Sequence, residues 1–461
     1  MGEASRRHVV VVGGGITGLS AAYELSRAAD PPAVTVLEAS DRLGGTILTT
    51  PFAGLPAVDA GPDSVLARVP WAVELLRELG LADELVAPAT GKASLWWHGA
   101  LHPIPPGLVL GLPTGLPALA RSHLLSWPGK ARAAIEPLLP RTDGDDDLGL
   151  TVRRRFGAEV YDRLVGPLIG SINAADPRRI SLAATAPQVA EAAARHRSLL
   201  LGLRRNRPSG GTAAPVFLTH PDGLGHVVHQ LAVVLRDSGV HLRVGQPAGS
   251  IVHDGERFRV GGLTADAVVL AVPAEVAAGT LDEVAPAAAP RLRTIRYASV
   301  AMVTLALSAG ASAPLDGSGY LVPATEQRHV TACSWASSKW AHLGREGQVL
   351  LRASLGRDGD EHALALDDEA LVAATLEDLR RHLGLRADPT DVRVTRWPRS
   401  FPQYEPGHLD RVVAIEARLP AGVVVAGSSY RGIGIASCIR QGREAARTTV
   451  ARWVEPAKLS R

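Results

Sequence analysis

Short runs of apolar residues alternate with segments of helical periodicity along most of the chain. An apolar run rich in β-branched residues, His8–Val12, leads into the glycine-rich turn Gly13–Gly18, and a helical pattern follows over residues 19–27. A second apolar run over residues 34–37 ends at Glu38. A strand, a helix and a strand in this order predict a β-α-β unit at the N-terminus.

The hydrophobic pattern changes character several times after this unit. It is mostly helical and broken by prolines over residues 87–207, and it alternates strands with one helix over residues 286–389. Buried-strand patterns return at residues 392–397 and 423–426. We therefore predict an α/β fold in which a Rossmann-type nucleotide-binding domain is interrupted by two insertions. The pieces of this domain are residues 1–85, 208–285 and 390–461, around a helical insertion at 86–207 and an α+β substrate-binding sheet domain at 286–389.

The glycine-rich turn Gly13–Gly18 has the spacing of a dinucleotide-binding motif. Gly13 permits the tight turn, Gly15 lets the backbone approach a pyrophosphate, and Gly18 lets the helix pack close to the sheet. The free N–H groups and positive dipole of the helix N-terminus then face the phosphates. Glu38 stands twenty residues after Gly18, where a carboxylate accepts hydrogen bonds from ribose hydroxyls and repels a 2′-phosphate.

Two further runs favour FAD over NAD. Glu38 is followed by Ala39-Ser40-Asp41-Arg42-Leu43-Gly44-Gly45-Thr46, whose arginine and paired glycines fit a second pass of the chain beside the diphosphate. Near the C-terminus, the run Gly427–Ala436 follows a buried strand and precedes a helix. Such a helix N-terminus, built from small residues, can place backbone N–H groups against the flavin ring or the ribityl chain.

Composition limits the cellular compartment and the kinds of partner that we expect for the protein. The two cysteines, Cys333 and Cys438, form no CxxC pair, which favours a reducing cytoplasm. The formal net charge of +3 is too small to indicate a nucleic-acid partner. No signal peptide is expected, because the first apolar run continues straight into the glycine-rich turn. No transmembrane segment is expected, because prolines interrupt the stretch that comes closest to one, Leu101–Leu119. That stretch is predicted to be a loop or a docking surface, and no metal site is predicted.

Taken in order, these runs resemble the protoporphyrinogen/coproporphyrinogen III oxidase family, in its soluble bacterial, coproporphyrin-forming branch, within the FAD amine-oxidase-like superfamily. The similarity extends through nearly the whole chain. Its other matching segments are Gly61-Pro62-Asp63-Ser64, Leu101–Pro105, Pro128–Ala133, His196–Leu200, Pro221–Leu224, Trp335–Trp340, Phe401–Tyr404 and Ser437–Gly442.

The resemblance implies a set of FAD contacts that carry over position by position. They are Gly13, Gly14, Gly15, Ile16, Thr17, Gly18, Glu38, Ala39, Arg42, Thr46, Gly61, Pro62, Asp63, Ser64, Ala248, Trp397, Ser428, Ile433, Gly434 and Ile435. Ala248 is expected near the adenine and Trp397 near the flavin.

The resemblance also implies the reaction, a six-electron oxidation of coproporphyrinogen III to coproporphyrin III in haem biosynthesis, with O₂ as acceptor and hydrogen peroxide as by-product. Aromatisation of the macrocycle drives it, so no catalytic acid or base is named. Because the substrate carries propionates, arginine forks are expected at the pocket entrance. The candidates are Arg68, Arg431 and the pair Arg204-Arg205, with His102 as a pocket-lining or hydrogen-bonding group.

Several alternatives stay open at this point. Protoporphyrinogen IX is the competing substrate, and an amine oxidase or a carotenoid desaturase would use the same fold. A flavin-binding protein without turnover is the alternative from a different class. Asn173 stands where relatives often have an aromatic residue, which leaves the shape of the substrate pocket open. The oligomeric state is open too, as is transient docking of a haem-pathway enzyme on Leu101–Leu119.

Overall fold

The computed structural model describes residues 6–140, 146–205 and 215–454. Its first layer is a five-stranded parallel sheet in the order β11-β2-β1-β15-β21. The strands are β1 (His8–Val12), β2 (Ala33–Leu37), β11 (His241–Arg243), β15 (Ala267–Leu270) and β21 (Val423–Val425). Residues of β1, β2 and β15 read as apolar runs because the sheet is covered on both faces. The predicted N-terminal β-α-β unit is confirmed.

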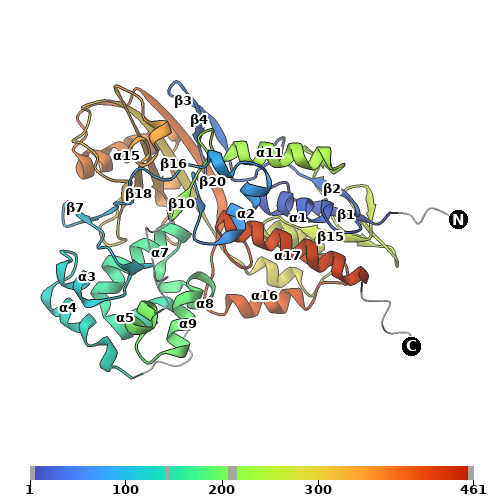
Figure 1. Cartoon of the computed structure of the whole chain (residues 1–461), viewed down its shortest axis with the longest axis horizontal. Coiled ribbons are helices and arrows are strands. Elements are labelled where there is room, and N and C mark those ends of the chain that lie inside the picture. The colour runs from blue at the N-terminus through green and yellow to red at the C-terminus, as the bar shows by residue number, and fades with distance from the viewer. Residues whose placement is uncertain (1–5, 141–145, 206–214, 455–461) are drawn as a thin grey trace.

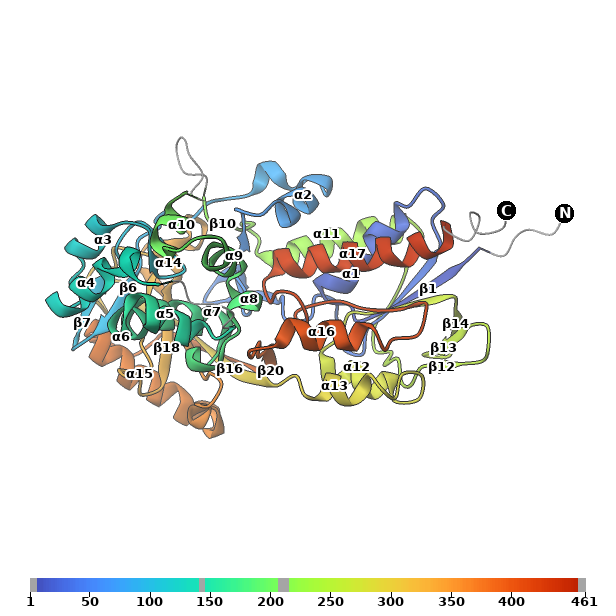
Figure 2. The same ribbon diagram turned by 90° about the horizontal axis from the view of Figure 1, so that it is seen from below.

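Helices cover both faces of this sheet, as Figure 2 shows. Val9 and Val11 face a core that includes side chains of four helices, whereas Val10 and Val12 face the core on the other side. The first face carries α1 (Ile16–Ser26), α2 (Pro70–Glu78), α11 (Leu224–Asp237) and α17 (Ile435–Val454). The second carries α12 (Ala274–Leu281), α13 (Ala289–Arg293) and α16 (His408–Glu416). A doubly covered parallel sheet confirms the predicted α/β class.

A second, seven-stranded sheet has the order β20-β16-β19-β18-β17-β6-β7 and lies beside the first layer (Figure 1). Helix α15 (Asp368–Leu383) packs on it through leucines of its buried side. Its strands are β20 (Asp391–Pro402), β16 (Tyr297–Ser308), β19 (Gln348–Leu355), β18 (Val330–Trp335), β17 (Gly319–Leu321), β6 (Ser94–Trp97) and β7 (Ala100–Pro103).

Two predicted domain borders differ from the membership of this sheet. Residues 392–397 were predicted as a buried strand of the nucleotide-binding domain, but they belong to β20, a partly exposed edge strand that pairs with β16. Strands β6 and β7 were placed in the helical insertion, yet they complete the opposite end of the same sheet. Both differences have one cause, because pairing between residues far apart in sequence leaves no local pattern.

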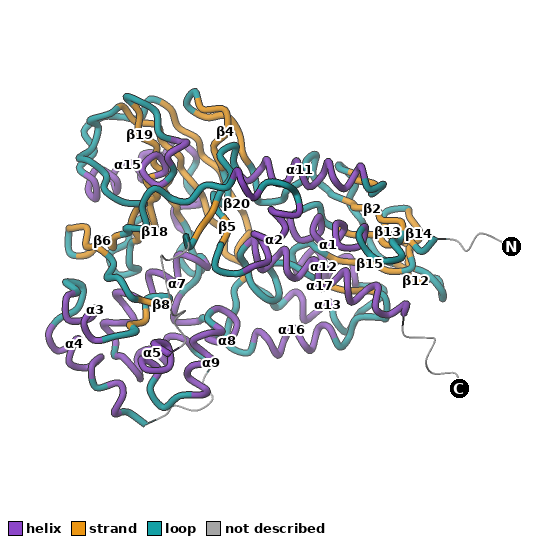
Figure 3. The backbone as a smooth tube through the Cα atoms, viewed as in Figure 1, coloured by secondary structure: helices purple, strands orange, loops and turns teal. Residues whose placement is uncertain are grey.

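The helical part, at the lower left of Figure 3, surrounds its own core, which contains Val152, Phe156 and Leu164. Its helices are α3 (Leu116–Arg121), α4 (Trp127–Ala134), α5 (Leu148–Phe156), α6 (Ala158–Val160), α7 (Gly166–Asn173), α8 (Leu182–Thr185), α9 (Pro187–Arg195) and α10 (Leu199–Arg205). The stretch at residues 101–119 is divided among the end of β7, β8 (Leu108–Val109), β9 (Leu112–Pro113) and the start of α3. None of the described helices has both the length and the apolar character required to cross a bilayer.

Short elements join the two sheets. Strands β3 (Thr49–Phe52) and β4 (Leu55–Asp59) form a hairpin, and β5 (Val65–Leu66) pairs with β10 (Phe217–Leu218). Helix α14 (Ala336–Lys339) follows β18. The predicted domain border at residue 208 lies outside the described residues, and the three-part division of the chain stays a prediction.

Candidate cofactor and active site

The three glycines of the first turn each meet the steric demand expected of them. Gly13 has φ +105°, and a Cβ there would lie 2.4 Å from the carbonyl oxygen of Ala271. A Cβ on Gly18 would lie 1.9 Å from the carbonyl oxygen of Gly13, so α1 packs against the turn at a distance that only glycine allows. A Cβ on Gly15, in contrast, would meet no atom within 4 Å. Gly15 therefore borders open space where a ligand fits.

Helix α1 begins at this open space with an uncapped N-terminus. Gly15 is the N-cap residue and no side chain accepts a hydrogen bond there. The first backbone bond of the helix runs from Leu19 N–H to the Gly15 carbonyl, 3.0 Å, so the N–H groups of Ile16, Thr17 and Gly18 have no acceptor within the helix. Unpaired N–H groups and the helix dipole together form a binding site for a phosphate group. The residues present thus fit a dinucleotide diphosphate.

The run Ala39–Thr46 passes beside this turn, as the sequence predicted. Gly44 N–H donates to the Gly14 carbonyl at 2.9 Å, and Gly45 faces Gly15. Arg42 donates to the carbonyls of Gly45 at 2.6 Å and Ile47 at 3.1 Å. Its guanidinium therefore fixes the turn from within, and its contact with the cofactor stays a prediction.

The Glu38 carboxylate organises the other end of the expected dinucleotide site. It accepts hydrogen bonds from Gly14 N–H at 2.7 Å and from Ser40 N–H at 2.8 Å. The Glu38 carbonyl accepts from Gln246 N–H at 2.8 Å, two residues before Ala248. The structure thus brings the predicted ribose contact and the predicted adenine contact into one region.

The C-terminal run supplies a second helix N-terminus close to the first. Ile435 begins α17, and a Cβ on the preceding Gly434 would meet no atom within 4 Å. Helices α1 and α17 lie side by side in Figure 2, and a Cβ on Gly442 of α17 would lie 2.2 Å from the carbonyl oxygen of Thr17. Ile16 and Ile435 border the same small apolar cavity. Runs from opposite ends of the chain therefore form one site.

Buried tyrosines hold the C-terminal run in place. The hydroxyl of Tyr404 donates to the Ser428 carbonyl and accepts from Gly432 N–H at 2.9 Å. The hydroxyls of Tyr297 and Ser429 are 2.6 Å apart. Sequence reasoning assigned no role to Tyr404, although it belongs to the matching segment Phe401–Tyr404.

We expect Tyr404→Phe to fold normally and to bind FAD roughly tenfold more weakly, because the two hydrogen bonds that the buried hydroxyl loses contribute about 1–3 kcal/mol together. The loop keeps its sequence but loses the bridge between Ser428 and Gly432. Titration of the apoprotein with FAD measures the effect. Tyr161→Phe is the matched control, since the buried hydroxyl of Tyr161 has no hydrogen-bond partner. Equal FAD affinity in both variants would contradict the assigned role of Tyr404.

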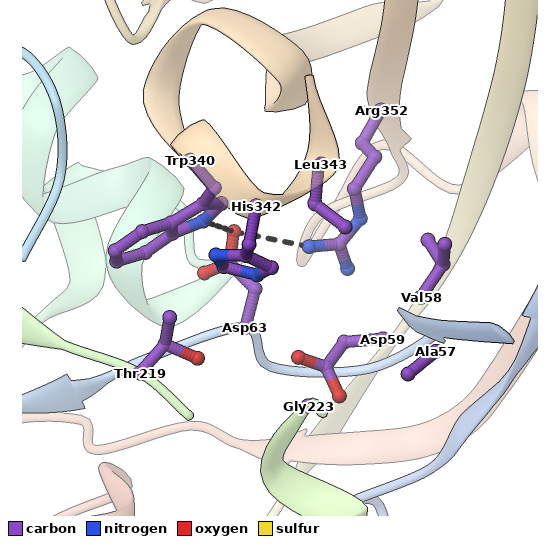
Figure 4. Close-up of a pocket in the computed structure, with 10 residues that line it drawn as sticks. All are labelled: Ala57, Val58, Asp59, Asp63, Thr219, Gly223, Trp340, His342, Leu343 and Arg352. Carbon is purple, nitrogen blue, oxygen red and sulfur yellow. Dashed lines mark hydrogen bonds and ion pairs between the residues drawn. The ribbon is translucent and has the colours of Figure 1, made fainter. Parts of the chain in front are cut away.

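The predicted segment Gly61–Ser64 is anchored to the seven-stranded sheet and the residues that follow it by an ion cluster around Asp63 (Figure 4). A Cβ on Gly61 would lie 2.1 Å from the Thr46 carbonyl oxygen, so this segment packs against the Ala39–Thr46 run. The Asp63 carboxylate lies 3.1 Å from each of three nitrogens. These are Lys339 Nζ, Arg352 Nη1 and Trp340 Nε1.

Electrostatics keep Asp63 ionised. Burial opposes the charge, but Lys339, Arg352 and the Trp340 indole N–H outweigh burial and hold the pKa of Asp63 below its ordinary value. Arg352 also donates to the Gly61 carbonyl. Sequence reasoning gave Lys339 and Arg352 no role. The signal for Arg352 was a charged residue inside the apolar run of β19, which indicates a buried pair.

A cavity of about 10 Å³ adjoins this cluster and is bordered by Asp59, Asp63, His342 and Arg352 (Figure 4). This is about the volume of one water molecule, so it is not the cofactor site itself. Burial raises the pKa of Asp59 to about 6, against the stabilising hydrogen bond from Thr49. The cavity lies between β4, the loop before α11 and Arg352 of the seven-stranded sheet, beside the segment predicted to contact the flavin.

Trp397 reaches the same segment from β20. Its Nε1 donates to the Ala60 carbonyl at 3.3 Å, and its ring lies 3.4 Å from a Cβ built on Gly61. The pairing of β20 with β16 shifts register between Ala298 and Val300, and Arg399 has φ +47°. A bulge of this kind redirects side chains near a site. Trp397 therefore lies beside the Gly61 segment, and its predicted contact with the flavin stays a prediction.

The predicted substrate-binding residues do not gather in one place. Arg431 forms a bidentate ion pair with Glu416, so its guanidinium is already occupied. His102 lies on the edge strand β7, far from α1 in Figures 1 and 2, and its Nε2 is 3.1 Å from the Trp97 carbonyl of its own hairpin. Arg68 and the pair Arg204-Arg205 are exposed. Asn173 donates to the Ile169 carbonyl of its own helix at 2.9 Å.

Within the described part of the chain, one group of side chains places possible metal ligands close together, namely His220, Asp222 and His226. Both nitrogens of His220 are already in hydrogen bonds, with Asp222 N–H and with Glu84, each at 3.1 Å. The rings of His220 and His226 stack with their centroids 4.3 Å apart, so the in-plane lone pairs do not converge. No metal role is assigned to this group.

The chain is similar in sequence to a family of flavoproteins and to several known oxidases. Residues 16–449 match the family model described as flavin containing amine oxidoreductase. A coproporphyrinogen III oxidase of Bacillus subtilis is 37% identical, covering 95% of this chain and 97% of that protein. The coproporphyrinogen III oxidase of Mycobacterium tuberculosis is 38% identical, covering 94% and 95%.

A solved structure from Exiguobacterium sp. 255-15, described as a candidate protoporphyrinogen oxidase, superposes with a TM-score of 0.87. It is 32% identical, and the match covers 97% of this chain and 99% of that one. Cyclohexylamine oxidase from Brevibacterium oxydans matches with a TM-score of 0.69 at 18% identity, covering 98% and 100%. The second likeness shows the fold alone.

Proposed function

Because the chain belongs to the flavin-containing amine oxidoreductases and, within them, to the protoporphyrinogen/coproporphyrinogen III oxidase family, we propose that it converts coproporphyrinogen III to coproporphyrin III. FAD is its cofactor. Dioxygen is the proposed acceptor, with hydrogen peroxide as the reduced product and the cytoplasm as the expected location. Six electrons and six protons leave the substrate, and three molecules of O₂ take them up as three of H₂O₂.

The observation that carries this proposal is the full-length match to coproporphyrinogen III oxidases. The chain also has an intact dinucleotide cradle, by which we mean the turn Gly13–Gly18 and the N-terminus of α1. The relatives are matched over nearly their whole length. The three glycines of the first turn keep the close contacts and the open space that a diphosphate needs. Both helix N-termini of the site are built from small residues. A protein that had lost the cofactor would have no need to keep these constraints.

The chain's own residues bind and orient rather than perform acid–base chemistry. Bound FAD supplies the acceptor for electrons from the substrate. The N–H groups at the start of α1 would hold the diphosphate, and Glu38 would accept hydrogen bonds from the ribose. Gly61 and Trp397 border the region expected for the flavin ring, and the Asp63 ion cluster fixes that border. Precise placement of reacting groups is a major source of rate enhancement.

A direct comparison of substrates tests the proposal. Purified protein with bound FAD is given coproporphyrinogen III or protoporphyrinogen IX in air, and porphyrin fluorescence and peroxide release are followed. We expect faster turnover of coproporphyrinogen III, with three peroxides released per porphyrin formed. Faster turnover of protoporphyrinogen IX would keep the family and overturn the substrate. Bound FAD that neither porphyrinogen reduces would overturn the oxidase activity and redirect attention to amines and carotenoids.

A further inference from the structure

Arg357 is a buried cation whose side chain is almost without partners. It is 5% exposed and follows β19, in a turn closed by backbone hydrogen bonds in both directions with Asp360. Its Nη2 donates to the Val322 carbonyl at a long 3.4 Å, and its Nε has no partner. A guanidinium has five N–H donors. Most of the hydrogen-bonding capacity of Arg357 is therefore unused.

The other buried arginines, in contrast to Arg357, each pair with a carboxylate. Four arginines are buried among the described residues. Arg155 pairs with Glu136, Arg352 with Asp63, and Arg443 with Glu78. Arg357 alone among these four has no carboxylate within ion-pair distance. Since a buried charge without a counter-charge is costly, Arg357 calls for a negative partner, and none is paired with it among the residues that the structure describes.

Three acidic residues near Arg357 already have other partners. Asp358 pairs with Arg296. Asp360 accepts from Gln327 at 2.9 Å and pairs with His362. Asp176 lies farther off and pairs with Arg178 at 3.1 Å. None of these carboxylates is free to turn toward Arg357 without breaking another bond, so these described acids do not supply the missing negative charge.

Arg357 lies next to the region where the flavin and its substrate are expected. The peptide N–H of Asp358, which follows Arg357 directly, donates to the Ala174 carbonyl at 2.8 Å. Ala174 packs in one small apolar cluster with Trp397, whose ring borders Gly61. Ala174 thus contacts both the turn that contains Arg357 and the Trp397 cluster beside the predicted flavin ring.

From this combination we propose that Arg357 binds a propionate carboxylate of the tetrapyrrole substrate, an assignment that rests on the function proposed above. A carboxylate accepts two parallel N–H bonds from a guanidinium. A bound propionate would neutralise the buried charge of Arg357 and accept hydrogen bonds from its unused N–H groups. Arg357 thereby replaces Arg431 and His102, whose polar groups are already bound within the protein, as the anchor for a substrate carboxylate.

The proposal makes opposite predictions for stability and for binding. Arg357→Met removes a charge that has no partner in the free protein, so the ligand-free variant should melt at the same temperature as the parent or higher. The same variant should raise KM for coproporphyrinogen III by roughly ten- to a hundredfold, the usual loss for a charge-assisted hydrogen-bonded pair. The value of kcat should change much less, because the carboxylates are remote from the reacting carbons.

Binding of the stable product separates this proposal from the activity. Coproporphyrin III is titrated into the holoenzyme and into Arg357→Met and Arg357→Lys, beside its tetramethyl ester, which keeps the macrocycle without the negative charges. We expect Arg357→Met to weaken coproporphyrin III but not the ester, and Arg357→Lys to recover part of the affinity. Arg328→Gln is the control, since Arg328 is exposed in the same sheet domain and pairs only with Glu377.

A lower melting temperature for Arg357→Met with unchanged KM and unchanged coproporphyrin affinity would show a structural arginine and overturn the proposal. Equal losses for coproporphyrin III and its ester would also overturn it, because charge would then play no part. If the parent protein fails to oxidise coproporphyrinogen III yet binds coproporphyrin III through Arg357, the proposed activity falls and the carboxylate site stands.

Discussion

Gly15→Asp is expected to yield a folded protein that purifies without FAD and has no oxidase activity. Gly15 has φ −73° and ψ 175°, a conformation that any L-residue adopts. A Cβ there meets no atom within 4 Å. Aspartate is also a favoured N-cap residue, because its carboxylate accepts hydrogen bonds from the free N–H groups of the first turn. The apoprotein should therefore be as stable as the parent, or more stable by roughly a few tenths of a kcal/mol.

The same substitution attacks the cofactor site in two ways. The new carboxylate occupies the N–H groups that the diphosphate needs, and it adds a negative charge beside two others. Like-charge juxtaposition costs several kcal/mol, so we expect FAD affinity to fall by about a hundredfold or more. The absorbance ratio of flavin to protein and a titration of the apoprotein with FAD measure this directly.

Gly279→Asp is the matched control for this experiment. Gly279 lies on the exposed side of α12, and a Cβ there also meets no atom within 4 Å. The substitution Gly279→Asp introduces the same side chain at a position away from the dinucleotide cradle. Full FAD content in Gly15→Asp would show that the diphosphate does not lie at the start of α1. A protein that fails to fold would contradict the open space seen at Gly15.

Asp63→Asn is the second substitution with a large expected effect. The Asp63 and Lys339 side chains are 17% and 16% exposed and that of Arg352 is 5% exposed, so removal of the carboxylate leaves one buried and one largely buried cation without their shared counter-charge. Breaking a buried pair of this kind costs about 3–5 kcal/mol. The Gly61 segment would lose its anchor as well, so FAD affinity should fall together with stability.

The pH dependence of this effect has a definite sign. The pKa of Asp63 is lower in the folded protein than in the unfolded chain, so the folded state binds fewer protons. The stabilisation is fully present above the unfolded pKa of about 3.9 and is lost as pH falls below it. The difference in melting temperature between parent and Asp63→Asn should therefore be constant from neutral pH down to about pH 5 and should shrink below about pH 4.

Thermal melts of the apoproteins across this pH range test the prediction. Asp316→Asn is the control, because the Asp316 carboxylate pairs with Lys92 at the surface and is 78% exposed. Exposed pairs contribute about 0–1 kcal/mol, so this variant should melt close to the parent. A stability loss in Asp63→Asn no larger than in Asp316→Asn would mean that solvent screens the cluster, contrary to its burial.

The dinucleotide cradle could be predicted from sequence because its constraints are local. Gly13, Gly15 and Gly18 act within one turn and one helix, and their spacing alone dictates what the backbone does there. The strand His8–Val12 was predicted with the bounds that the structure shows, because a buried parallel strand carries its signal in its own side chains.

Only the tertiary structure decided how distant segments meet. It assigned residues 391–402 to the second sheet and brought Lys339 and Arg352 to Asp63. It also showed which arginines are already paired, which removed Arg431 and pointed to Arg357. Such partnerships depend on sheet pairing between residues far apart in the chain and on which charges burial leaves uncompensated. Neither property leaves a periodic trace in the sequence, because each is a relation between segments rather than a property of one.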